Sequence, residues 1–155
     1  MNLKHAVALS VLLLSTCAWA CPDQSGELMD CHLTYLSQDT HYQLTINQEA
    51  QAAGTVYRYD IATVGATGIV THTLRSSIAD GKEYPLSSDS DSRSTTVTQC
   101  NGDQLVTINT TYKDSDNSIL LTSETDSTKV DGVYKSQITI RFQDGRVIQE
   151  SLVCR

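Results

Sequence analysis

The sequence contains none of the short motifs that mark common catalytic or phosphate-binding sites. It has no Gly-x-Ser-x-Gly, no His-Glu-x-x-His and no Gly-rich phosphate loop. The histidines after residue 20 (His32, His41 and His72) are not spaced like metal ligands, and no Cys-x-x-Cys pair is present. We therefore predict a non-enzymatic protein without a cofactor or a metal site.

Basic residues are also scarce, with 11 Lys and Arg against 18 Asp and Glu and a net charge of −7. No basic run offsets this charge, which repels phosphate backbones, so the sequence argues against a nucleic-acid partner. Long apolar runs are absent as well. The apolar run at residues 6–14 is interrupted by Ser10 and falls short of the roughly 20 residues that a transmembrane helix needs. We predict no membrane span.

The first 20 residues have the pattern of a secretory signal peptide. Lys4 supplies a positive start, residues 6–14 form the apolar region, and residues 18–20 (Ala-Trp-Ala) form a small-x-small cleavage site. We predict that residues 1–20 are removed and that residues 21–155 form a single exported domain, periplasmic or secreted, with a net charge of −8. A lipid anchor on Cys17 or Cys21 is the disfavoured alternative, because the residues before each cysteine fit lipoprotein signals poorly.

Cleavage leaves four cysteines, Cys21, Cys31, Cys100 and Cys154. An even number of cysteines in an oxidising compartment indicates two disulfides. Sequence alone allows three connectivities. The hairpin pattern described below returns Cys100 and Cys154 to the same end of a sheet, which favours Cys100–Cys154 together with Cys21–Cys31. This pairing holds unless the N-terminal strands intervene.

Short alternating runs rich in Thr, Val, Ile and Tyr dominate the chain after residue 30, as in half-buried strands. They predict about nine strands and one short helical segment or polar connection at residues 47–53, where an asparagine N-cap precedes helix-forming residues and a glycine. The expected strands are residues 32–36, 42–46, 55–64, 69–75, 95–100, 104–112, 119–130, 133–142 and 146–153.

Three Xaa-Gly pairs separate the last strands: Asn101-Gly102, Asp131-Gly132 and Asp144-Gly145. Such pairs supply the positive φ angles of a two-residue type I′ hairpin, so they predict an antiparallel meander from residue 95 to residue 154. With these turns, Val97 would pair with Val106 and Phe142 with Val147. Several strands have apolar residues on both faces, so they are partly covered on both sides or contain bulges. Because the hairpins are sequential and no long crossover is evident, we favour an up-and-down, lipocalin-like barrel of about eight to nine strands over a β-sandwich.

Tyrosine is the most frequent aromatic residue, with seven Tyr against one Phe and one Trp. A tyrosine ring with a hydroxyl suits the rim of a cavity or an interface, and Tyr57, Arg58 and Tyr59 form the candidate binding site. We expect a barrel that binds a small apolar or amphipathic molecule, with many Thr, Ser and Ala positions that leave room inside. The alternative is a protein-binding module, such as an inhibitor or assembly factor, that uses loops or a sheet edge on an extracytoplasmic protein.

Overall fold

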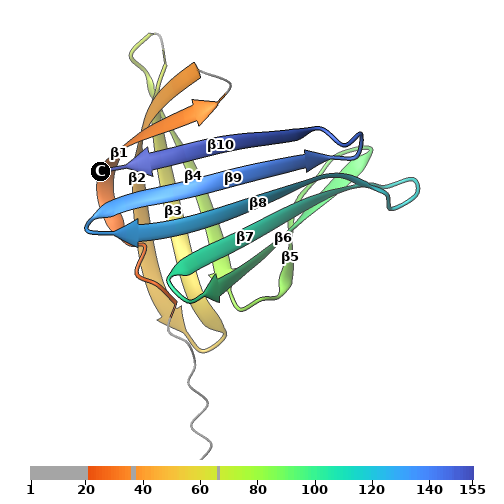
Figure 1. Ribbon diagram of the computed structural model, residues 1–155, viewed down its shortest axis with the longest axis horizontal. Helices are drawn as coiled ribbons and strands as arrows, with labels where there is room; N and C mark the ends of the chain where they lie inside the picture. The colour runs from red at the N-terminus through yellow and green to blue at the C-terminus, as the bar shows by residue number, and fades with distance from the viewer. Residues whose placement is uncertain (1–20, 36–37, 66) are drawn as a thin grey trace, which may run out of the picture.

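A computed structural model describes residues 21–35, 38–65 and 67–155, and the elements within them are all β-strands (Figure 1). The predicted signal peptide at residues 1–20, including Cys17, lies outside the described residues. The strands are β1 (Gly26–Tyr35), β2 (Gln38–Gln51), β3 (Gly54–Val64), β4 (Val70–Ala79), β5 (Glu83–Ser88), β6 (Ser92–Asn101), β7 (Gln104–Lys113), β8 (Ile119–Val130), β9 (Val133–Phe142) and β10 (Val147–Cys154).

The ten strands form one sheet in the order β4-β3-β2-β1-β10-β9-β8-β7-β6-β5. Nine of them close into a barrel, because Ala79 at the end of β4 also pairs with Thr98 of β6. The predicted all-β barrel is therefore confirmed. It differs from the prediction in not being strictly antiparallel, because the closing pair between β4 and β6 is parallel. The intervening strand β5 pairs with the edge of β6 and stands outside the ring.

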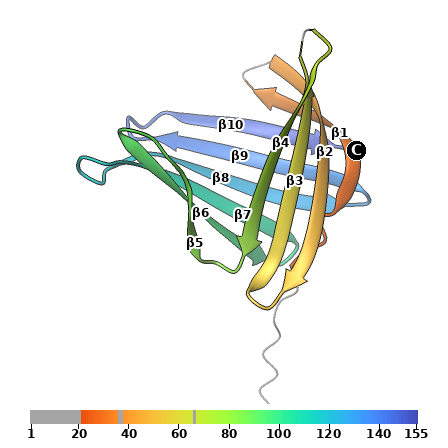
Figure 2. The same ribbon diagram turned by 180° about the vertical axis from the view of Figure 1, so that it is seen from behind.

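The closure between β4 and β6 is short and lies at one end of the barrel. Within the described residues, β4 pairs with β6 at Ala79. The residues of β4 before Ala79 pair with β3 and have no strand partner on their other side. Figures 1 and 2 show β4 and β5 diverging from the turn that joins them. We call this stretch, where β4 is paired with neither β5 nor β6, the β4–β5 seam.

The predicted meander from β6 to β10 is present, but two of its three turns differ in detail. Val130 pairs with Val133, and Asp131 and Gly132 both have positive φ angles, as a type I′ turn requires. This turn is as predicted.

In the other two turns, glycine is not the second residue of a two-residue loop, contrary to the prediction. Between β6 and β7, Gly102 is the first loop residue with φ +60°, as in a type II′ turn, so Val97 pairs with Ile108 and not with Val106. Between β9 and β10 the loop has three residues and Gly145 is the last of them. The backbone N–H of Gly145 donates to the Phe142 carbonyl. Phe142 therefore does not pair with Val147, which pairs with Arg141 instead.

Residues 47–51 continue β2 and are not helical, and Ala52 and Ala53 form the turn into β3. Five consecutive residues of this segment pair with β3, from Asn47 opposite Arg58 to Gln51 opposite Gly54. The side chains of Glu49 and Arg58 add an ion pair across these strands. Strand pairing thus overrides the local helix propensity, which is worth a few tenths of a kcal/mol per residue.

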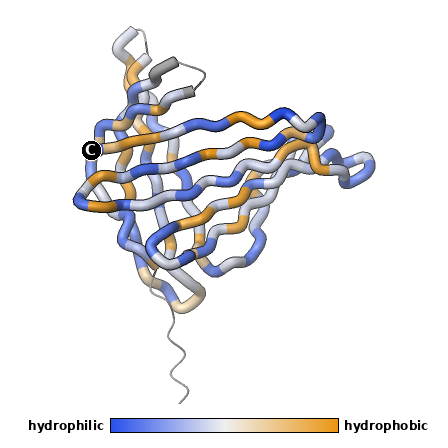
Figure 3. The backbone as a smooth tube through the Cα atoms, viewed as in Figure 1, coloured by the Kyte–Doolittle hydropathy of each residue, from blue (hydrophilic) through white to orange (hydrophobic). Residues whose placement is uncertain are grey.

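The apolar core fills one end of the barrel. Figure 3 shows hydrophobic positions interspersed with hydrophilic ones along the strands, as expected when one face of each strand lines the interior. The inward-facing apolar side chains gather around a buried disulfide. Members of the cluster are Met29, Cys31, Leu44, Ile46, Tyr57, Leu105, Tyr134, Leu152 and Cys154.

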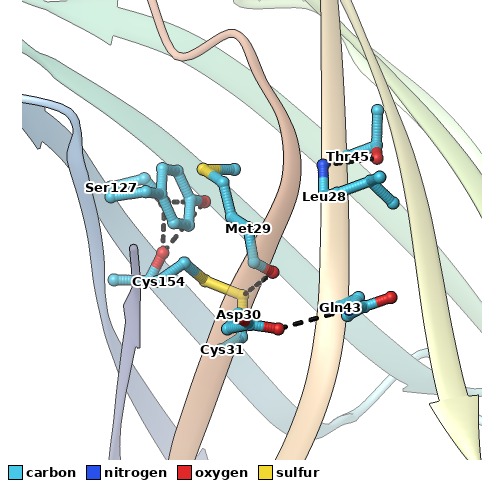
Figure 4. The surroundings of a disulfide bond; sticks show 10 residues. Leu28, Met29, Asp30, Cys31, Gln43, Thr45, Ser127 and Cys154 are labelled. Carbon is cyan, nitrogen blue, oxygen red and sulfur yellow. Dashed lines mark hydrogen bonds between the residues drawn. A yellow bond between two sulfur atoms is a disulfide. The ribbon is translucent and has the colours of Figure 1, made fainter.

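The disulfides are Cys31–Cys154 and Cys21–Cys100, so the predicted pairing of Cys21 with Cys31 and Cys100 with Cys154 is wrong. The physical reason is the strand order. Because β1 lies beside β10, Cys31 stands directly opposite Cys154 with a Cα–Cα distance of 4.1 Å. Figure 4 shows this bridge, beside which Gln43 donates a hydrogen bond to Asp30.

Candidate functional site

The predicted site residues on β3 alternate between the two faces of the barrel wall. Tyr57 is fully buried and donates a hydrogen bond to the Pro22 carbonyl at 3.0 Å. Arg58 lies outside, with Nη1 2.8 Å from Oε2 of Glu49. Tyr59 lines a cavity inside the barrel. The structure therefore does not join Tyr57, Arg58 and Tyr59 into one surface.

The cavity occupies the part of the barrel that the apolar core leaves open. Its volume is ≈ 190 Å³. Its wall is formed by residues of β3 to β9, and most of them carry a hydroxyl group. The lining residues are Tyr59, Arg75, Ser76, Ser77, Leu86, Thr96, Thr107, Asn109, Thr125, Ser127 and Tyr134.

A ring of three hydroxyl groups separates the cavity from the apolar core. Tyr134 donates to Ser127 at 3.0 Å, Ser136 donates to Tyr134 at 3.0 Å, and the two serine oxygens are 2.7 Å apart. Each hydroxyl thus donates once and accepts once. This ring satisfies its own donors and leaves none for another molecule.

Several other polar groups of the cavity wall make no well-formed hydrogen bond to protein. The Ser77 hydroxyl is buried next to the Tyr59 phenol, whose pKa it lowers, but has no well-formed hydrogen bond in the described structure. Within the same residues, the side chains of Thr96, Asn109 and Thr125 make no hydrogen bond, whereas Thr107 pairs with Thr98 at 3.2 Å. Thr96, Asn109 and Thr125 are half-buried, so their polar groups are accessible to a bound molecule or to water.

The tyrosines near the cavity act as neutral hydroxyl groups. Burial raises the pKa of Tyr59 well above its usual range, and the nearby Tyr134 adds to this effect. Burial likewise raises the pKa of Tyr57 to about 12, with a contribution from the Asp23 carboxylate. Neither phenol ionises near neutral pH, so neither supplies a base or a nucleophile.

The cavity reaches the outside at the β4–β5 seam. A second hollow in the seam shares Ser76, Ser77, Leu86 and Thr96 with it. The remaining residues of this hollow come from β4, β5 and β6: Ile78, Tyr84, Pro85 and Thr98. The seam is therefore a lateral entrance to the interior.

The N-terminal segment (residues 21–25) crosses the opposite end of the barrel. Cys21 is bonded to Cys100 of β6, Tyr57 of β3 holds the Pro22 carbonyl, and Lys129 of β8 donates to the Ser25 carbonyl. Gln24 is fully buried between them. This segment covers the core end, whereas the cavity lies beyond the core, beside the seam and beside an outer hollow that shares Tyr59, Arg75 and Ser76 with it.

The Cys21–Cys100 bridge also bears on the lipid-anchor alternative. Lipoprotein anchors are thioethers on the cysteine sulfur, and a disulfide-bonded sulfur has no valence left for one. Cys21 therefore carries no such anchor in this structure.

Comparisons with protein-family models, with curated proteins and with solved structures found no match. The site is therefore interpreted from its own geometry. In the described part of the chain, no helix has the length and apolarity needed to cross a membrane. No group of three or more His, Cys, Asp or Glu side chains among the described residues is placed to hold a metal ion.

The residue pattern identified Tyr59 but missed most of the wall. Thr107 and Asn109 alternate with outward residues on β7, as do Thr125 and Ser127 on β8. Serine and threonine are abundant throughout this sequence, so composition gave no signal that these particular residues face inward. Arg75 was missed for another reason: the sequence does not show which face of β4 points into the barrel.

Proposed function

We propose that this protein is an exported binding protein that holds a small amphipathic molecule inside its barrel. One observation carries the proposal: a cavity of ≈ 190 Å³ lined by polar side chains that lack protein partners and connected to the surface at the β4–β5 seam. Binding pockets combine apolar surface with a few placed polar groups, and this wall combines methyl and aromatic groups with hydroxyls and an amide.

The cavity volume limits the size of the ligand. An engineered protein cavity of about 150 Å³ binds benzene. The present cavity is somewhat larger, which leaves room for one ring bearing a single polar group. The wall also favours polar groups over a bare hydrocarbon, because an apolar occupant would leave the Asn109 amide and the Thr125 hydroxyl unpaired.

Export is supported by the two disulfides, which form and persist in oxidising compartments. The residues of the predicted signal peptide agree with that location. An exported protein with a laterally open cavity would take up its ligand outside the cytoplasm.

The test uses benzamide, a neutral ring with one amide, followed by chemical-shift changes in NMR spectra. We expect a Kd of about 1 mM or tighter, which corresponds to about −4 kcal/mol and lies within the range for ligands of this size. Thr125→Phe places a phenyl ring in the cavity and should abolish binding. Thr122→Phe, on the outer face of the same strand, is the matched control and should bind normally.

Absence of benzamide binding to the wild-type protein, or equal binding to the Thr125→Phe variant, would refute the proposal. Both variants introduce the same side chain into β8, where an aromatic residue suits a strand. Comparing their spectra without ligand shows whether each variant is folded, so loss of binding can be separated from loss of structure.

A second candidate function is supported by the unpaired edge of β4. The backbone N–H of Gly65 donates to the Ile69 carbonyl, so these two residues are a hydrogen-bonded pair of the β3–β4 ladder. Because hydrogen-bonded pairs alternate with non-hydrogen-bonded ones in antiparallel strands, the N–H and C=O groups of the even-numbered residues of β4 point away from β3. Val70 and Leu74 on this edge also have exposed apolar side chains. An extended segment of another exported protein could pair with such an edge.

Proline substitution tests this second function. Leu74→Pro removes an N–H that points away from β3 and should abolish capture of a strand-forming partner while the barrel remains folded. If partners isolated from the extracytoplasmic compartment bind the Leu74→Pro variant as they bind the wild type, the edge is not the docking site.

A further inference from the structure

Arg75 is the one charged side chain among the described residues that line the cavity. It lies on β4 directly opposite Tyr59 of β3, and both side chains contribute to the cavity wall. Arg75 is exposed and also lines an outer hollow beside β3 and β4. Its guanidinium group therefore stands at the boundary between the interior and the solvent.

Arg75 has no carboxylate partner in the described structure. Four of the other five arginines do have one, and Arg155 is the exception. Their pairs are Arg58–Glu49, Arg93–Asp114, Arg141–Glu124 and Arg146–Asp144. In a protein with more acidic than basic residues, a guanidinium group without a partner is available to an external anion.

On the cavity side, the surroundings of Arg75 favour an anion as well. The outer hollow that Arg75 also lines contains the Asp60 carboxylate, which has His72 Nδ1 at 2.9 Å. None of the described residues that line the cavity is an Asp or a Glu. The hydroxyls of Ser77, Thr96 and Thr125 and the amide of Asn109 can all donate hydrogen bonds. A ligand oxygen inside the cavity would thus meet donors and no negative charge.

We infer that the ligand carries a carboxylate group, which binds Arg75 at the mouth of the cavity while the rest of the molecule occupies the interior. This inference rests on the proposed function. The planar guanidinium fork matches a carboxylate with two parallel hydrogen bonds. The cavity volume restricts the remainder to about one ring or an equally short aliphatic chain.

The experiment compares benzoate with benzamide, which have the same ring and differ in the charge of the polar group. Binding of both probes is measured by NMR titration at neutral pH and low salt. We expect wild-type protein to bind benzoate about tenfold or more tightly than benzamide, as is typical of charge-assisted hydrogen bonds. In Arg75→Gln the preference should disappear, while benzamide binding remains. Arg75→Lys should keep part of the preference.

Arg141→Gln is the matched control, because it removes the same charge from the outer face of β9, where Arg141 is exposed and paired with Glu124. It should leave the preference for benzoate intact. Equal affinity for the two probes in the wild type, or a preference that survives in Arg75→Gln, would overturn the inference and leave the cavity proposal standing. If neither probe binds the wild type, both proposals fail.

Discussion

Removal of the Cys31–Cys154 disulfide gives a stringent test of the fold. The bridge closes a loop with a sequence separation of 123 residues. With the second bridge intact, however, a shorter route joins the two cysteines. This route runs along the 10 residues between Cys31 and Cys21, crosses the Cys21–Cys100 bridge, and continues along the 54 residues from Cys100 to Cys154. A loop of about 60 residues corresponds to about 4 kcal/mol of unfolding free energy in the chain-entropy model.

Packing adds to this loss, because Cys31 and Cys154 are among the most buried residues of the core, with exposed fractions of 1% and 0%. Replacing both with alanine removes two sulfur atoms from the core, which we expect to cost a further 1–2 kcal/mol or so. The free energy of unfolding of the double alanine variant should therefore fall by about 5–6 kcal/mol.

The assay is urea unfolding at equilibrium, followed by circular dichroism, with the Cys21→Ala/Cys100→Ala variant as the comparison. That variant loses a loop constraint of similar size, but its cysteines are only half-buried. We expect it to lose about 4 kcal/mol. If the two variants are equally stable, or if the second is the less stable, the burial argument is wrong. A disulfide-linked peptide joining Cys21 to Cys31 in the wild type would refute the connectivity itself.

Two further predictions concern the end of the barrel where β4 pairs with β6. Gly54 has φ +147°, and a Cβ atom there would lie 3.0 Å from the Ala79 carbonyl oxygen. Gly54→Ala should therefore lower the unfolding free energy by about 1–3 kcal/mol in urea, and unchanged stability would contradict this account. The backbone N–H of Lys82 and the hydroxyl of Tyr84 hold the pKa of Asp80 below its usual value. Asp80 thus stabilises the fold above about pH 4, and this contribution is lost as the pH falls through its lowered pKa. Asp80→Asn should flatten the acid limb of the stability curve, and an NMR titration that gave Asp80 an ordinary pKa would contradict the prediction.

The sequence predicted the class of the fold because the relevant signals are local. Alternating Thr, Val and Ile residues identify strands, and the Asp131-Gly132 turn has the predicted geometry. The two misplaced turns show the limit of such signals, because an Xaa-Gly pair does not specify whether glycine is the first, second or third residue of the loop. Residues 47–53 show a related limit, since pairing with β3 is a contact that their own sequence does not encode.

Long-range features were predicted least well. The position of β1 beside β10 determines which cysteines meet, and no local pattern near Cys31 or Cys154 reports it. The lining of the cavity depends on long-range pairing in the same way. Tyr59 was identified by residue type, whereas Arg75 becomes part of the cavity wall through its pairing with Tyr59 across two strands.

The connectivity of the disulfides has a consequence for the order in which they form. A chain that enters an oxidising compartment N-terminus first exposes Cys21 and Cys31 together, while Cys154, the penultimate residue, arrives last. Closing the short loop between Cys21 and Cys31 costs the least entropy, so early oxidation favours that bridge. The native bridges join each of these cysteines to one of the two later ones. For a protein exported as proposed, we therefore expect maturation to involve thiol–disulfide exchange, and yields of native protein to depend on a disulfide isomerase in the oxidising compartment.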